Sequence, residues 1–256
     1  ISHLERLCKK FNPGLLVIVN VLGHANDISK ILKLKSKYNF QLIEDNCESL
    51  GSKFKAKSLG SYGLASSHSF YFGHHITTVE GGMVSTSDDN LYQLSRMLRS
   101  HRMTREASED VRNRYITDYP DLNPLFTFAI AGFNFRSTEL NAVIGLSQMK
   151  KLDKNIYVRR KNLDTWLDCL SSHKYKVDYY RPGNSNFALP LILNEADSSL
   201  KNRVCAKLED LGVEYRLGTA GGGNLSRQPF LKKYKHRVVD DQHVVNHIHE
   251  YGLYVG

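Results

Sequence analysis

The stretch LLVIVNVLGHANDISKILKLKSKYNFQLIED, residues 15–45, decides the fold that the sequence predicts. Residues 15–21 are a nearly continuous apolar, β-branched run, which is typical of a strand buried on both faces. An Asn-Asp pair at 26–27 offers a helix cap, and apolar residues follow it at helical spacing. A second apolar run, 40–43, ends just before an acidic pair that includes Asp45. Strand, helix and strand within about 30 residues form a βαβ unit, which predicts a parallel sheet.

The elements predicted next along the chain extend this sheet. Strand-like runs occupy 65–72 and 82–86, and Asp88 offers the cap of a helix that follows. Residues 101–131 are irregular, polar and aromatic, so we expect a long loop there with room for one short helix. A Ser-Thr pair at 137–138 then offers the cap of another helix with a wide apolar face.

The C-terminal part of the chain indicates a second domain. Its predicted elements are a long bridging helix, a strand, a helix, a strand and a last helix, at 151–170, 187–193, 198–211, 213–217 and 238–250. We therefore predict part of a large domain at 1–150 and a smaller domain at 151–256. We also expect the chain to be an internal part of a longer protein, because it opens in a helix-like stretch and stops in an apolar one.

The composition is that of an ordinary soluble globular protein, with 41% hydrophobic and 24% charged residues among 256. No apolar run approaches the roughly 20 residues of a membrane helix, so we expect no membrane partner. The four cysteines show neither a CxxC pair nor metal-ligand spacing, which predicts a reducing, cytoplasmic location and no metal site. They are Cys8, Cys47, Cys169 and Cys205.

The net charge of +9 is scattered, and its densest stretch, 232–237, is short enough to be a solvated helix end or loop. The sign of the charge also suits a nucleotide-diphosphate substrate. Nucleic-acid binding would rest on net charge alone, so we do not expect it.

Two places where predicted strands end carry residues suited to chemistry. Asp45 follows a parallel strand, and ligands of open α/β sheets bind at that edge. Ser69 lies near the end of the next predicted strand and His74 follows that strand. They offer a hydroxyl for a phosphate oxygen and an imidazole, the side chain most often used as a general base. Taken alone, the position of Asp45 slightly favours a helix cap or a surface acid, and a pair such as His74-His75 is more often structural or a chance surface pair.

Three later motifs are weaker when taken singly. Gly81 and Gly82 permit a tight turn or a close approach of backbone to a ligand. Residues 132–141 mix aromatic and polar side chains just before a capped helix. Arg216 and the glycine-rich turn at 221–224 suit an anionic substrate, with a loop hinge as the alternative.

These blocks together resemble, in order and spacing, the DegT/DnrJ/EryC1/StrS family of sugar aminotransferases. The matching stretches are IEDNCESLG at 43–51, GSYG at 60–63, SFY at 69–71, EGGMV at 80–84, and the motifs at 132–141 and 216–229. The resemblance implies an α/β, fold-type-I aminotransferase-like fold. It consists of a mostly parallel sheet with helices on both faces and a smaller C-terminal α+β domain.

The resemblance also implies roles in binding pyridoxal 5'-phosphate or pyridoxamine 5'-phosphate. Asp45 would pair with the pyridinium nitrogen, Glu48 would lie beside the ring, and Ser69 would bind the phosphate. Asn134 would reach the phosphate of the neighbouring subunit's cofactor, which predicts a homodimer with sites at the subunit interface.

One position departs from the aminotransferases of this family, which carry a lysine five residues after the serine. This chain has His74 there, and an imidazole does not hold the cofactor covalently as a lysine amine does. The pattern is similar to that of the sugar 3-dehydratases, which use a non-covalently held cofactor, a histidine base and L-glutamate. The substrate so implied is a nucleotide-diphosphate 4-keto-6-deoxy sugar, near Arg216 and Asn224.

Two alternatives remain open from the sequence, and a third is not expected. An unusual aminotransferase could use Lys53, Lys55 or Lys57 instead, and a non-catalytic homologue could bind sugar nucleotide or cofactor without turnover. A related dehydratase type uses an iron–sulfur cluster, which needs about four thiolates. Residues 48–168 contain no cysteine, so we expect no cluster.

Overall fold

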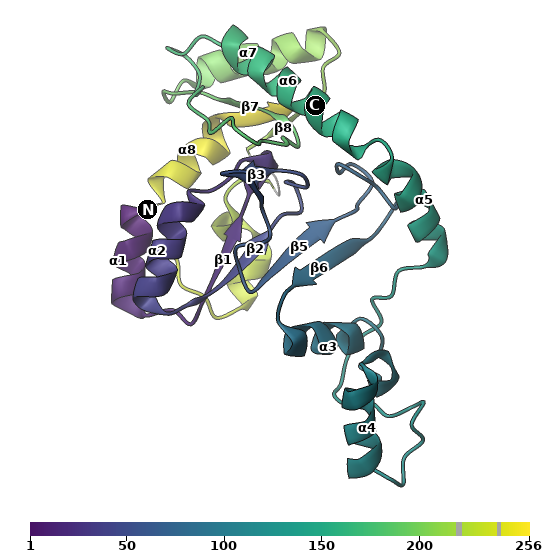
Figure 1. Ribbon diagram of the computed structural model, residues 1–256. Coiled ribbons are helices and arrows are strands. Elements are labelled where there is room, and N and C mark those ends of the chain that lie inside the picture. The colour runs from purple at the N-terminus through teal and green to yellow at the C-terminus, as the bar shows by residue number, and fades with distance from the viewer. Residues whose placement is uncertain (219–221, 240–241) are drawn as a thin grey trace. The chain divides into compact units, whose positions relative to one another are not determined.

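Four strands form the main sheet of the computed structural model, which describes residues 1–218, 222–239 and 242–256. The strand order is β1-β2-β5-β6 (Figure 1), with bounds Leu15–Val19, Gln41–Asp45, Ala65–Ser69 and Gly82–Thr86. β1, β2 and β5 run parallel, and β6 pairs antiparallel with β5. The predicted βαβ unit is confirmed, since α2 (Ile28–Tyr38) connects β1 to β2 and Asp27 caps it.

Two strands end earlier than predicted. β1 stops at Val19 because residues 21–23 form a 3₁₀ turn in which Leu22 adopts a positive φ of 52°. β5 stops at Ser69, whose side chain accepts a hydrogen bond from the backbone N–H of Tyr71 at 3.2 Å and so starts a turn. Both differences shorten the strands at their carboxyl ends, where the candidate residues lie.

Helices pack on one face of the main sheet, whereas side chains on the other face are partly exposed. α1 (Ser2–Phe11) and α2 pack on one face around Cys8, Leu34 and Phe40. On the other face, apolar side chains remain about half exposed: Val17 (54%), Val19 (49%) and Val84 (59%). The register pairs Val19 with Asp45, and Asp45 with Ser67, so Asp45 lies on this open face.

Three further helices follow β6 in the same compact unit, which comprises residues 1–19, 27–47 and 60–152. α3 (Asp89–Leu98) is capped by Asp88, and α5 (Glu139–Met149) begins with a capping box made by Thr138 and Asn141. The segment 101–131, where we expected a long loop with room for one short helix, contains α4 (Glu109–Asp118). No residue of α4 is buried, so it lacks the apolar periodicity that reveals a helix in sequence.

The second compact unit comprises residues 20–26, 48–59 and 153–256. It holds a sheet in the order β7-β9-β8, with bounds Leu189–Ile192, Gly252–Val255 and Tyr215–Leu217, and all pairs are antiparallel. Its core contains Leu191, Leu253 and Val255, with Trp166 packed against them. Its described residues also form the helices α6 (Leu152–Cys169), α7 (Ser198–Asp210) and α8 (His243–Tyr251), the short hairpin β3-β4 (Lys53–Phe54, Lys57–Ser58), and 3₁₀ helices at Val21–Gly23, Leu225–Arg227 and Pro229–Lys233.

Residues 20–26 and 48–59, which we predicted within the first domain, group with the C-terminal residues instead. The Ser52 hydroxyl donates to the Gly23 carbonyl at 2.8 Å and accepts from the Ser185 N–H at 2.8 Å. A Cβ on Gly23, whose φ is +89°, would lie 2.3 Å from the Ser185 carbonyl oxygen, so the close packing requires glycine. Among the described residues, no helix combines the length and apolar character needed to cross a bilayer.

His24 makes the stability of the second unit depend on pH. Burial, with a smaller effect of Lys176, lowers the pKa of His24 from 6.5 to about 4. Its ring stacks on Tyr179, with ring centroids 4.6 Å apart, and its Nδ1 contacts the Asn184 amide nitrogen at 3.0 Å. The folded state therefore keeps His24 neutral down to about pH 4, whereas the unfolded chain protonates it as the pH falls below 6.5.

We expect the free energy of unfolding of this unit to fall as pH drops from 6.5 towards 4, since protons then bind the unfolded chain more strongly. At about 1.4 kcal/mol per pKa unit, the full effect is about 3 kcal/mol. Urea unfolding followed by Trp166 fluorescence at several pH values measures it. The His24→Gln variant should lack this part of the pH dependence, and an identical pH dependence in both proteins would contradict the prediction.

Candidate functional site

Asp45 lies at the carboxyl end of β2, at the edge of the main sheet. Its Oδ1 accepts two hydrogen bonds, from the Ser67 hydroxyl at 3.2 Å and from the Cys47 backbone N–H at 3.0 Å. Within the described residues, Oδ2 accepts none. The carboxylate is thus held through one oxygen and presents the other on the open face of the sheet.

His74 reaches the same edge from the loop that joins β5 to β6. Hydrogen bonds of 2.9 Å from the Phe70 N–H to the Gly81 carbonyl and from the Thr78 N–H to the Phe70 carbonyl close this loop. The His74 Nδ1 contacts the carbonyl oxygen of Cys47 at 2.5 Å. The structure therefore brings His74 to Cys47, two residues after Asp45.

The His74 loop is also tied to the start of α5. The Asn141 side-chain amide donates to the carbonyl oxygens of Thr78 at 2.6 Å and Glu80 at 3.3 Å. Asn141 also completes the capping box of α5 with Thr138. Asn141 lies in the motif noted at 132–141, but this link could not be predicted from the sequence because it joins residues about 60 positions apart.

Glu44 is a second residue that sequence reasoning missed. Its side chain is fully buried on the face opposite Asp45, and its two carboxylate oxygens accept three backbone hydrogen bonds. The donors are the N–H groups of Gly60 (2.7 Å), Tyr62 (2.7 Å) and Gly63 (2.9 Å). Glu44 therefore fixes the 60–63 loop, which leads directly into β5. The signal available in the sequence was an acid at the end of an apolar strand, followed by Gly60 and Gly63.

Ser69 and Asn134 are also in the first unit. Ser69 lies two residues beyond Ser67 on β5, on the same face as Asp45, and its hydroxyl accepts from the Tyr71 N–H. Asn134 is exposed and pairs with Ser100 in an isolated β-bridge, and its Oδ1 accepts from the N–H and Nε of Arg136 at 3.2 and 3.1 Å. Its contact with a neighbouring subunit's cofactor stays a prediction.

The other predicted site residues belong to the second unit. The Glu48 carboxylate accepts from the Leu22 N–H at 2.8 Å and so holds the turn that ends β1. Asn224 is 3% exposed and its side chain bonds Ser226, Gln242 and Asn246, so the structure gives it a local structural role. Its predicted substrate contact, like that of Glu48 with the cofactor, stays a prediction. Gly221 lies outside the described residues.

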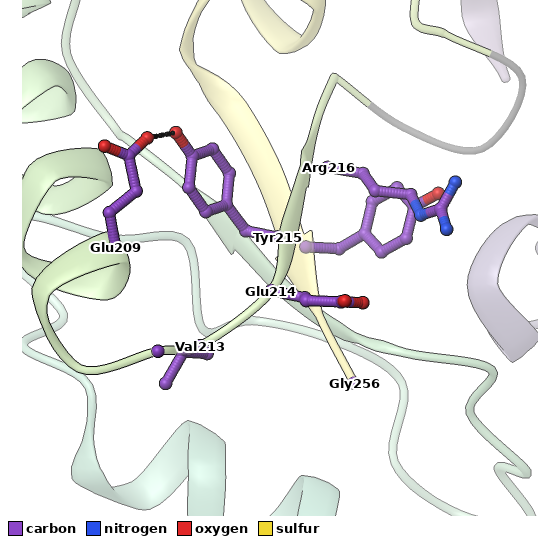
Figure 2. Close-up of a pocket in the computed structure, with 8 residues that line it drawn as sticks. Glu209, Val213, Glu214, Tyr215, Arg216 and Gly256 are labelled. Atoms are coloured by element: carbon purple, nitrogen blue, oxygen red, sulfur yellow. Dashed lines mark hydrogen bonds between the residues drawn. The ribbon is translucent and has the colours of Figure 1, made fainter.

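Arg216 lines a cavity of about 730 Å³ in the second unit, together with Glu209, Glu214, Tyr215 and Tyr254. Figure 2 shows the Tyr215 hydroxyl bonded to Glu209, at 2.6 Å, and Arg216 directed away from this pair. The bond to Glu209 raises the pKa of Tyr215. Because carboxylates share the lining with the guanidinium, the charge of the cavity does not by itself select an anion.

None of the four cysteines forms a disulfide. The part of the chain that the structure describes holds no group of three or more His, Cys, Asp or Glu residues arranged for a metal ion. Lys53 and Lys57, two of the lysines considered as alternatives to His74, lie on the β3-β4 hairpin, and Lys55 lies in its turn. The candidate site of the first unit is therefore built from Asp45, Ser67, Ser69, His74 and the Cys47 backbone.

Comparison with known proteins gives consistent matches. The GDP-4-keto-6-deoxy-D-mannose 3-dehydratase of Yersinia pseudotuberculosis is 34% identical over 245 residues, which cover 94% of this chain and 61% of that protein. A crystal structure of GDP-4-keto-6-deoxymannose-3-dehydratase with bound GDP-perosamine superposes with a TM-score of 0.86 at 28% identity, covering 100% of this chain and 66% of that one. Another structure of that enzyme, with a trapped PLP-glutamate adduct, superposes with a TM-score of 0.82 at 30% identity. The match covers 94% of this chain and 63% of that one.

These matches confirm the predicted fold-type-I aminotransferase-like fold. The chain spans about three fifths of the length of the curated relative, 61%. The sequence also matches the family described as the DegT/DnrJ/EryC1/StrS aminotransferase family over residues 2–250. With nearly its whole length matched, the chain belongs to the DegT/DnrJ/EryC1/StrS aminotransferase family.

Proposed function

We propose that this protein is a lyase that removes the C3 hydroxyl group of a nucleotide-linked 4-keto-6-deoxy sugar with the help of pyridoxamine phosphate. The observation that carries the proposal is a histidine, His74, held against the end of β2 beside Asp45, at the position where the family's aminotransferases keep a lysine. The 34% identity to a 3-dehydratase supports it. GDP is the favoured nucleotide because that relative's name specifies a GDP sugar.

The residues at the sheet edge fit the ring of such a cofactor. Asp45 presents Oδ2, which suits a protonated pyridine nitrogen. Half-exposed Val19 lies next to it on β1, and half-exposed Val84 lies on β6 beyond Ser67, so the same face offers apolar surface. Ser69 on the neighbouring strand offers a hydroxyl for a phosphate oxygen. When bound, the cofactor supplies an electron sink that stabilises charge developing next to the sugar C4 carbon.

His74 is suited to move a proton at this edge. A neutral imidazole is a competent base near pH 7, and it forms no lasting covalent link to the cofactor, which would therefore be held non-covalently. The Cys47 carbonyl fixes the ring through Nδ1, so the proton would be taken up at Nε2. His74 has no side-chain amine that could release an aminated sugar from the cofactor, as the lysine of an aminotransferase does. Loss of the C3 hydroxyl group is therefore favoured over transfer of an amine to C4.

L-Glutamate is the proposed amine donor, and the adduct trapped in a related structure supports this choice. Replacing the C3 hydroxyl group by hydrogen removes one oxygen atom and reduces the sugar by two electrons. Oxidation of glutamate to 2-oxoglutarate and ammonia supplies those electrons and gains one oxygen atom. The proposed reaction is thus balanced without an iron–sulfur cluster or another reductant.

Borohydride trapping separates this proposal from an aminotransferase that uses another lysine. The complete protein is incubated with pyridoxal phosphate, reduced with borohydride and analysed by peptide mass spectrometry, with a lysine-dependent aminotransferase as positive control. We expect no lysine to carry the reduced cofactor. A stoichiometric adduct on Lys53, Lys55 or Lys57 would contradict the lyase. Tight cofactor binding without turnover of any sugar nucleotide would instead favour a non-catalytic homologue.

The same proposal includes a homodimer, for which α5 provides support. Leu140, Val143 and Leu146 on this helix are exposed by 79%, 65% and 67%, and Phe133 and Phe135 just before it by 71% and 72%. Apolar groups gathered in this way on one segment are typical of a surface that associates with another protein. A second copy would cover them, and Asn134 lies within the same segment. The cytoplasmic location stays a prediction.

We expect a Leu140→Glu, Leu146→Glu double variant of the complete protein to become monomeric, because it places two charges in the contact. Sedimentation velocity measures the change, and Leu122→Glu serves as the control at an exposed leucine outside α5. A double variant that sediments as the unmodified protein does would contradict the assignment of α5 to the interface.

A further inference from the structure

A short chain of contacts connects β5, β2 and the His74 ring. The Ser67 hydroxyl donates to Asp45 Oδ1 at 3.2 Å, and the Cys47 N–H donates to the same oxygen at 3.0 Å. The carbonyl of Cys47 then meets His74 Nδ1 at 2.5 Å. The Cys47 sulfur also lies 3.8 Å from the Ser67 hydroxyl oxygen. Ser67 therefore touches both ends of the segment that holds the His74 ring.

The contact between the Cys47 carbonyl and His74 Nδ1 decides which ring nitrogen carries the proton. A carbonyl oxygen has no proton to donate, so the Nδ1 atom that meets it must be the donor. In a neutral imidazole with Nδ1 protonated, the lone pair lies on Nε2. The opposite tautomer would set the Nδ1 lone pair against the carbonyl lone pairs. The Cys47 carbonyl thus selects the tautomer in which Nε2 is the base.

The orientation of that carbonyl depends in turn on Asp45 and Ser67. Asp45 forms a side-chain turn with the N–H two residues later, which restricts the backbone between β2 and Cys47. Ser67 is the register partner of Asp45 in the parallel ladder, and its hydroxyl fixes the rotation of the carboxylate. The same carboxylate presents Oδ2 towards the proposed cofactor position.

We propose that Ser67 is a positioning residue that, through Asp45 and the Cys47 backbone, holds His74 in the Nδ1-protonated tautomer with Nε2 as the base. One hydroxyl on β5 thereby sets both the carboxylate that would face the pyridine nitrogen and the imidazole that would move the proton. The value of this arrangement for catalysis rests on the proposed lyase function, whereas the tautomer itself is a property of the chain alone.

The test is nitrogen-15 NMR of the complete protein labelled in its histidine rings, with His74 signals identified by their loss in the His74→Asn variant. We expect His74 to show a protonated Nδ1 and an unprotonated Nε2. In Ser67→Ala the Nε2-protonated form should appear, and kcat for sugar dehydration should fall about tenfold with KM unchanged. Ser67→Thr, which keeps the hydroxyl, should retain the Nδ1-protonated form of His74 and the unmodified kcat.

Ser66→Ala is the matched control, because Ser66 neighbours Ser67 but contacts His68 Nε2 at 3.2 Å instead of Asp45. It should leave the His74 spectrum unchanged. A wild-type His74 protonated on Nε2, or a Ser67→Ala spectrum identical to wild type, would overturn the positioning role. If the tautomer behaves as expected while no dehydrated sugar forms, the positioning role stands and the proposed lyase function fails.

Discussion

The His74→Asn variant of the complete protein is expected to dehydrate its sugar substrate about 10²–10⁴-fold more slowly than the unmodified enzyme, as is typical when a general base is removed. Asparagine can still donate a hydrogen bond towards the Cys47 carbonyl, so the loop should keep its place while the base is lost. Steady-state assays of sugar dehydration at saturating cofactor and glutamate measure the effect, with the loss expected in kcat.

His101→Asn is the control for this variant, because His101 is exposed and lies outside the β5–β6 loop. It should retain full activity. Circular dichroism and cofactor binding of His74→Asn should match those of the unmodified protein. A loss of less than tenfold in kcat would exclude His74 as the base and direct attention to another group at the sheet edge.

The Glu44→Ala variant should lower the free energy of unfolding of the first unit by about 3–5 kcal/mol. The variant leaves the N–H groups of Gly60, Tyr62 and Gly63 without their acceptor in a place where the Glu44 side chain was fully buried. Glu44→Gln should lose less, since its amide keeps one acceptor oxygen but turns an N–H₂ group towards a backbone donor.

Urea unfolding followed by circular dichroism, with hydrogen exchange of the 60–63 amides, measures the effect of these variants. Glu109→Ala is the control at an exposed acid in the first turn of α4, where a change within about 1 kcal/mol is expected. If Glu44→Ala unfolds at the same urea concentration as the unmodified protein, the buried carboxylate does not hold the loop.

Sequence patterns predicted the elements that bury an apolar face or carry a cap. β6 occupies Gly82–Thr86 as predicted, and α3 begins after Asp88, whose carboxylate accepts from the Leu91 N–H at 2.7 Å. The position of α4 within the loop expected at 101–131 could not be predicted, because all its side chains remain at least partly exposed. Apolar residues recur at helical spacing where one face of a helix is buried, so a helix without a buried face has no such pattern in its sequence.

The residues of the candidate site could be predicted from the sequence, but the contacts that orient them could not. Asp45, Ser69 and His74 follow from strand ends and from the family resemblance, and the structure places them at one sheet edge. The contacts that orient them, from Ser67 and the Cys47 carbonyl, depend on strand register and on a loop that returns 27 residues later in the sequence. Local spacing contains no information about either.

The product of the complete protein tests the proposed lyase most directly. The enzyme is mixed with pyridoxal phosphate, L-glutamate and a GDP-4-keto-6-deoxy hexose, and the sugar nucleotide is analysed by mass spectrometry while 2-oxoglutarate is measured in parallel. We predict a product that has lost the C3 hydroxyl oxygen and keeps its ketone, with 2-oxoglutarate formed in equal amount. A product that keeps the C3 hydroxyl group and carries an amine in place of the ketone would contradict the lyase and establish transamination in its place.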